Sequence, residues 1–70
     1  MTSVFAESTD AAKSVTSALS DLGYDVNRTG KWVEVYGPLP IDSLKRMLKE
    51  WGFEVRKLKL DDGKYYLIVS

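Results

Sequence analysis

One pattern of residue types occurs twice in this 70-residue chain. The segment Leu22-Gly23-Tyr24-Asp25-Val26 returns as Trp51-Gly52-Phe53-Glu54-Val55, and the segment 30–36 is echoed by 63–69. Upstream of these segments, apolar positions also align: Val15, Ala18, Leu19 and Leu22 with Leu44, Met47, Leu48 and Trp51. Each unit reads helix, glycine stop, strand, turn, strand. The repeat therefore predicts one domain made of two α-β-β units, at about residues 8–37 and 38–70.

The second unit begins with a strongly amphipathic segment. Its apolar residues recur at spacings of three and four, at Ile41, Leu44, Leu48 and Trp51. Pro40 lies near the start, where a missing N–H has no consequence, and Gly52 follows the end, where a left-handed cap is needed. These signals predict a helix that ends close to Trp51.

The first unit carries weaker helix signals over about Thr9 to Leu22. Ser8 or Thr9 can act as N-cap, and Gly23 follows the end. The interior contains several Ser and Thr residues, which are poor helix formers. We therefore expect this helix to depend on the packing of its apolar residues.

Alternation and turn residues predict the strands. Asp62-Gly63 between two β-rich runs is typical of a hairpin, and residues 27–30 supply a looser turn in the first unit. Val33 and Val35 alternate with polar or aromatic neighbours, and the repeat predicts that Tyr66 and Ile68 share their helix-covered face.

The predicted fold class is α+β, a two-layer sandwich with both helices on one face of a four- or five-stranded sheet, in a ferredoxin-like or related topology. The number of strands depends on Ser3–Ala6, which either adds an N-terminal strand, giving the order βαββαββ, or does not.

Composition argues against several classes of function. His and Cys are absent, which removes the commonest general base and the thiol nucleophile, and the glycines stand singly rather than in a phosphate-binding loop. Asp61 and Asp62 are adjacent carboxylates, but nothing nearby in the sequence supplies the roughly six or more oxygen ligands that a calcium loop needs. We therefore predict a protein that is not an enzyme, with no catalytic residues, no metal site and no cofactor.

The absence of cysteine and of any long apolar run predicts a cytoplasmic protein that does not contact the membrane. A high charge content, a single Asn and no Gln are features of thermophilic proteins.

Ten basic and ten acidic residues balance in the whole chain, but the segment 37–70 carries seven basic and five acidic ones. A cluster that could contact an anion or a nucleic acid comprises Lys45, Arg46, Lys49, Arg56, Lys57 and Lys59. The alternative is structural. Asp42 with Arg46 and Arg46 with Glu50 have the spacing of ion pairs on a solvated helix, and lysines protect an edge strand from pairing.

The face of the sheet opposite the helices is predicted to be apolar. It would carry Trp32, Glu34 and Tyr36 from one strand and, by the repeat, Tyr65, Leu67 and Val69 from another. A solvated face should be mostly polar, and an apolar patch usually marks an interface. The predicted partner-binding residues are therefore Trp32, Tyr36, Tyr65 and Leu67.

A change in strand parity, or cover from the N-terminal segment, would instead bury these residues. Parity does shift between Val55 and Leu58, and a β-bulge near Arg56 and Lys57 would explain the shift.

If the apolar face is exposed, two partner classes compete for it. Association with a protein, either a second copy or another chain, requires only apolar area. Single-stranded nucleic acid could stack on Trp32, Tyr36 and Tyr65 beside Lys57 and Lys59. The balanced net charge favours the protein partner.

The segment 41–70, with Trp51-Gly52-Phe53-Glu54-Val55 followed by Asp62-Gly63-Lys64-Tyr65-Tyr66-Leu67-Ile68, resembles the C-terminal half of TusA-like small sulfur-carrier proteins. The resemblance implies a two-layer α/β sandwich. The family carries sulfur on a Cys-Pro pair that opens its first helix, whereas Ser8-Thr9-Asp10 stands here. The sulfur-carrier chemistry is therefore not expected.

Overall fold

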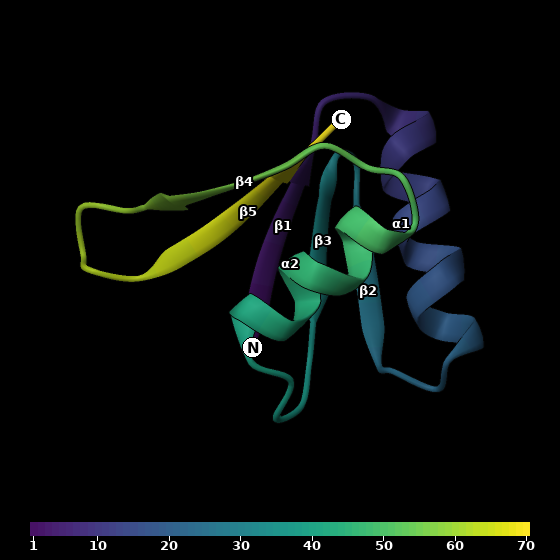
Figure 1. Ribbon diagram of the computed structural model, residues 1–70, viewed down its shortest axis with the longest axis horizontal. Coiled ribbons are helices and arrows are strands. Elements are labelled where there is room, and N and C mark those ends of the chain that lie inside the picture. Colours follow the sequence, from purple (N-terminus) through teal and green to yellow (C-terminus); the bar gives the residue numbers. More distant parts are fainter.

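The computed structural model describes residues 1–70, which form two layers, a five-stranded sheet and two helices (Figure 1). In chain order the elements are β1 (Thr2–Ala6), α1 (Thr9–Asp21), β2 (Val26–Thr29), β3 (Trp32–Val35), α2 (Ile41–Glu50), β4 (Val55–Lys59) and β5 (Tyr65–Val69). The predicted α+β sandwich is confirmed, and the N-terminal segment does form a strand.

The strands lie in the order β2-β3-β1-β5-β4, so the first strand of the chain occupies the centre of the sheet. β1 runs antiparallel to β3 and parallel to β5, and the other two neighbouring pairs are antiparallel. Each α-β-β unit therefore contributes one edge strand and one inner strand. β1 joins the two units by pairing with both inner strands.

Capping residues set the helix ends where the sequence predicted them. The Ser8 side chain accepts a hydrogen bond from the Ala11 N–H at 3.1 Å and so caps α1. Gly23 and Gly52 follow the two helices with φ of 92° and 95°, a conformation that residues with a Cβ rarely adopt. One turn differs from its prediction: β2 extends to Thr29, and Gly30-Lys31 alone makes the connection to β3.

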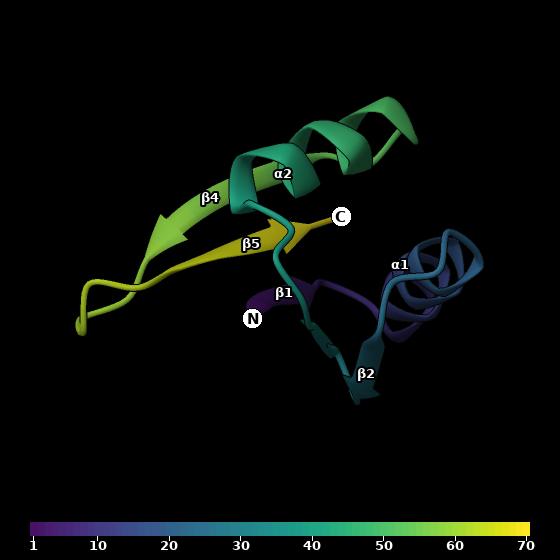
Figure 2. The same cartoon turned by 90° about the horizontal axis from the view of Figure 1, so that it is seen from below.

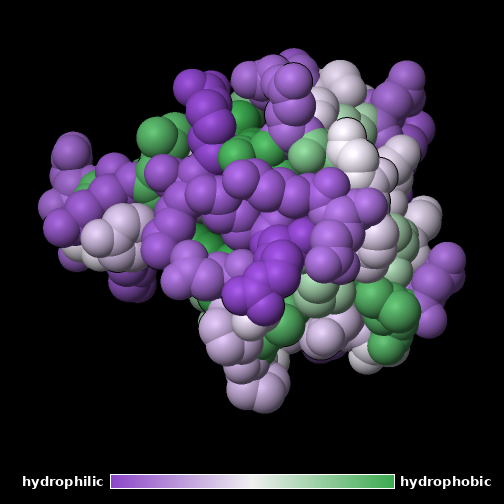
Figure 3. Space-filling view, in the orientation of Figure 1, coloured by the Kyte–Doolittle hydropathy of each residue, from purple (hydrophilic) through white to green (hydrophobic).

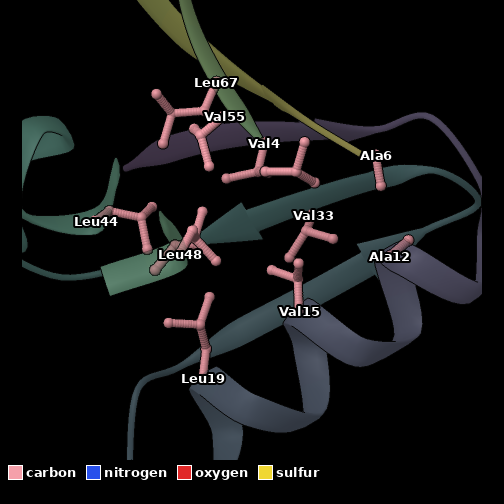
Figure 4. Close-up of a cluster of buried hydrophobic side chains, with 12 residues drawn as sticks. Val4, Ala6, Ala12, Val15, Leu19, Val33, Leu44, Leu48, Val55 and Leu67 are labelled. Carbon is pink, nitrogen blue, oxygen red and sulfur yellow. The ribbon is translucent and has the colours of Figure 1, made fainter. Parts of the chain in front are cut away.

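Both helices pack on the same face of the twisted sheet, as Figure 2 shows. The side chains between the layers form one core of 12 buried apolar residues (Figure 4): Val4, Ala6, Ala12, Val15, Leu19, Val33, Val35, Leu44, Leu48, Val55, Leu67 and Val69. No buried polar side chain interrupts this core. No helix combines the length and the apolar character required to cross a membrane.

The register of β5 corrects the predicted facing of its side chains. Leu67 lies opposite Val4 of β1 and is fully buried, so Leu67 and Val69 face the helices. The prediction that Tyr66 and Ile68 take this face is therefore wrong. The repeat aligned Tyr66 with Val33, but Val4 of β1 lies opposite Val33 in β3 and opposite Leu67 in β5, one residue further along, and a shift of one residue reverses every side chain of a strand.

The predicted β-bulge in β4 is absent. Arg56 and Lys57 pair in continuous register with Ile68 and Leu67 of β5. Val55 therefore points into the core, while Leu58 points to the opposite face of the sheet. The change of parity seen in the sequence reflects a strand that presents apolar residues to both faces.

Candidate interface on the helix-free face of the sheet

No helix covers the second face of the sheet, here called the open face (Figure 2). Alternation along each strand and the register between strands assign ten strand residues to it. They are Asn27, Thr29, Trp32, Glu34, Ser3, Phe5, Tyr66, Ile68, Arg56 and Leu58.

The first row across the open face runs Thr29, Trp32, Phe5, Ile68 and Arg56. Its three central members are apolar, and its two ends are polar. A second row contains Tyr66 and Leu58 next to each other and Glu34 between Ser3 and Asn27. The apolar residues thus form one continuous patch over β3, β1, β5 and β4, which we call the apolar patch (Phe5, Trp32, Leu58, Tyr66 and Ile68).

Aromatic rings form the centre of the apolar patch. The ring centroids of Phe5 and Trp32 are 5.0 Å apart in an edge-to-face arrangement, and those of Trp32 and Tyr66 are 5.8 Å apart. The Trp32 side chain remains 39% exposed, whereas Phe5 and Tyr66 are half-buried. Three neighbouring strands therefore hold one aromatic cluster with Trp32 as its most exposed member.

Only two of the ten open-face residues are charged. Glu34 is half-buried and accepts a hydrogen bond from the Ser3 hydroxyl at 2.9 Å. Arg56 lies on the edge strand and makes a long ion pair, 3.8 Å, with Glu7. The carboxylate and the guanidinium therefore lie on opposite sides of the apolar patch, on β3 and β4.

A shallow groove of about 450 Å³ runs beside Trp32. It is lined by Ser3, Thr29, Trp32, Glu34 and Leu60. Leu60 comes from the turn between β4 and β5 and is 44% exposed. The hairpin turn thus adds an apolar side chain to the border of the open face.

The four predicted partner-binding residues occupy different places. Trp32 lies on the open face, and Tyr36 follows β3 by one residue and is 39% exposed. Tyr65 belongs to the opposite side of the sheet, since it pairs with Lys59 and has the parity of Leu67. Leu67 is buried in the core and has no surface with which to contact a partner. Placing Tyr65 and Leu67 on the helix-free face was therefore wrong.

Tyr65 instead contacts two lysines near the end of the β4–β5 hairpin. The Nζ atoms of Lys57 and Lys59 lie 4.7 and 5.8 Å from the centre of its ring. Lys57 also donates a hydrogen bond of 2.9 Å to Asp42 at the start of α2. This hydrogen bond, together with the lysine charge, lowers the pKa of the Asp42 carboxyl.

The predicted basic cluster is divided between elements. Lys45, Arg46 and Lys49 lie on α2, where the surface facing the viewer in Figure 3 is largely hydrophilic. Lys57 and Lys59 are on the helix side of β4, and Arg56 alone is on the open face. The ion pairs expected within α2, from Arg46 to Asp42 and to Glu50, are not formed, and Asp42 pairs with Lys57 instead.

Four residues of the apolar patch were missed by sequence reasoning: Phe5, Leu58, Tyr66 and Ile68. Phe5 lies between the buried Val4 and Ala6, so strand alternation places it on the open face once residues 2–6 are taken as a strand. For Tyr66 and Ile68 no local signal exists, because β5 is apolar at every position.

No group of three or more acidic, His or Cys side chains is arranged to hold a metal ion. No protein-family model, curated protein or solved structure matches this chain.

Proposed function

We propose that this domain is a non-enzymatic binding module that associates with a protein through the open face of its sheet. The observation that carries the proposal is the apolar patch, in which the Trp32 ring contacts both Phe5 and Tyr66 on a face that no helix covers. Such a surface in contact with water is unfavourable unless a partner covers it.

The layout of the open face supports a protein partner. Aromatic residues are enriched at the energetic centres of protein interfaces, where they lose little conformational entropy on binding. The apolar patch is bordered by Thr29, Asn27, Ser3, Glu34 and Arg56, which provide a polar rim. An apolar centre within a polar rim is the common anatomy of such interfaces.

Two tryptophans with the same exposed fraction allow a matched test. Trp32 and Trp51 are each 39% exposed, but Trp51 lies at the end of α2, away from the open face. We expect Trp32→Glu to abolish capture of protein partners from native cell extract, because it places a charge at the centre of the apolar patch. Trp51→Glu should leave capture unchanged. Affinity purification followed by mass spectrometry measures both.

Each captured protein is then purified and its binding to the wild type and to both variants is measured by titration calorimetry. Circular dichroism establishes that both variants are folded. Equal binding by folded Trp32→Glu and by the wild type would show that the open face is not the interface.

A second candidate function is the binding of single-stranded nucleic acid. It is favoured by the aromatic rings on three neighbouring strands, a geometry on which successive bases can stack. Against it, Lys57 and Lys59 lie on the other side of the sheet, which leaves Arg56 as the one cation among the ten open-face strand residues. A backbone of phosphates requires several such cations.

Titration with oligothymidylate at low salt separates the two candidates. The protein-binding proposal predicts no quenching of the Trp32 fluorescence, measured in a Trp51→Phe background. Quenching that weakens as salt is raised would instead assign the open face to nucleic acid.

A further inference from the structure

We infer that the partner on the open face is a second copy of this chain, packed sheet against sheet about a two-fold axis. This inference rests on the proposed function and names its partner. It follows from the arrangement of side chains on the open face. The apolar patch has a carboxylate on one side and a guanidinium on the other, so two copies that face each other can match apolar with apolar and positive with negative.

The apolar patch determines where the axis must pass. Its residues extend from Trp32 on β3 to Leu58 on β4, so its centre lies between β1 and β5. Two copies cover each other's patch fully only when the two-fold axis passes through that centre. With the axis along the strands, β1 of one protomer lies over β5 of its partner, and β3 lies over β4.

This arrangement brings the two open-face charges together. The axis keeps each row of residues opposite the same row of the other copy. Arg56 on the partner's β4 therefore lies over Trp32. Glu34 lies in the next row of the same strand, about 7 Å along it, within reach of a long arginine side chain. Each guanidinium therefore meets a carboxylate and the face of an indole ring, and the symmetry forms this contact twice.

The contacts that Arg56 and Glu34 make within one protomer leave both able to pair across the dimer interface. The ion pair of Arg56 with Glu7 is 3.8 Å long between side chains that are 69% and 51% exposed, so it contributes little and is easily replaced. The Ser3 hydroxyl holds one oxygen of Glu34 and leaves the other free to accept a hydrogen bond from the partner. The whole chain has a formal net charge of zero, so two copies do not repel.

The size of the open face sets the expected strength. The four strands that overlap in this arrangement, of about five residues each, give a flat area of roughly 300 Å² per protomer, or about 600 Å² for the pair. Stable interfaces bury at least about 1,200 Å², and smaller ones are transient. We therefore expect a transient dimer with a dissociation constant of roughly tens to hundreds of micromolar, which forms at high protein concentration.

Charge reversal with the full-length protein tests the inference by sedimentation equilibrium. Arg56→Glu and Glu34→Arg each place like charges in contact twice, and we expect each to weaken dimerisation about tenfold or more. The double variant Glu34→Arg, Arg56→Glu restores the pair with exchanged sign and should recover most of the affinity. Lys45→Glu, on α2 and away from the open face, should dimerise like the wild type.

Two results would overturn the inference: a wild type that remains monomeric at about 1 mM, or folded single variants that dimerise as the wild type does. The proposed function fails separately, when Trp32→Glu keeps every partner that the wild type binds. A monomeric wild type with a Trp32-dependent heterologous partner would therefore remove the second copy and retain the binding module.

Discussion

Leu67 and Tyr65 lie two residues apart on the same side of β5, yet Leu67 is fully buried and Tyr65 is 48% exposed. Leu67 pairs with Val4 of the central strand beneath the helices. Tyr65 begins β5 near the hairpin turn, which extends past both helices in Figure 1. The position of a residue along the strand, relative to the end of the helix layer, therefore decides its burial.

We expect Leu67→Ala to lower the free energy of unfolding by about 2–5 kcal/mol, because it leaves a cavity in a small core. Tyr65→Ala removes an exposed ring and its contacts with two lysines, and should cost about 1 kcal/mol or less. Urea denaturation measures both variants. Similar small losses in the two would contradict the burial of Leu67.

At the scale of elements, α2 and β4 are joined by one exposed side-chain contact in addition to their apolar packing. The Lys57 ammonium lies 2.9 Å from a carboxylate oxygen of Asp42, next to the ring of Tyr65. The contact links the first turn of α2 to the middle of the edge strand. It therefore orients a short helix whose N-cap, Pro40, provides no side-chain hydrogen bond.

The lowered pKa of Asp42 predicts a pH dependence. Because the folded state binds this proton less tightly than the unfolded state, the contact stabilises the protein above the unfolded pKa of about 4. The stabilisation is lost as pH falls through the lower, folded pKa. Asp42→Asn should therefore unfold more readily than the wild type at neutral pH, with the difference vanishing in acid.

Thermal melts recorded from neutral pH to strong acid measure the difference in stability between Asp42→Asn and the wild type. Asp61→Asn, at an exposed hairpin position that is part of neither ion pair, serves as the control. A difference between Asp42→Asn and the wild type that persists unchanged in acid would contradict an electrostatic origin.

At the scale of the whole molecule, the fold depends on β1. Its residues pair with β3 on one side and with β5 on the other, and no other strand connects the two α-β-β units. Val4 lies between Val33 and Leu67 and is fully buried. The open face also depends on β1, which contributes Phe5 to the centre of the apolar patch.

We therefore expect Val4→Asp to abolish cooperative unfolding, because it places a carboxylate in the centre of the core without a partner. Val26→Asp, on the same face but on the edge strand β2, has access to water and should only lower the melting temperature. Circular dichroism melts compare them. A cooperative transition in Val4→Asp close to that of Val26→Asp would show that β1 is not essential.

Local physical chemistry in the sequence determined the helices, their glycine ends, the Asp62-Gly63 hairpin and the duplicated α-β-β order. Caps, turns and helical periodicity act between residues a few positions apart, so they can be predicted without a tertiary structure. The same reasoning identified Trp32 as a residue of the candidate interface.

Tertiary structure alone decided which side chains of β5 are buried and which cation pairs with Asp42. Residues Tyr65–Val69 are apolar at every position, so the strand has no alternation of its own, and its pairing with β1 chooses the side that is buried. Asp42 could pair along α2 or across to β4, and the fold places Lys57 within 2.9 Å. Both outcomes depend on contacts between segments distant in the chain, which residue order does not specify.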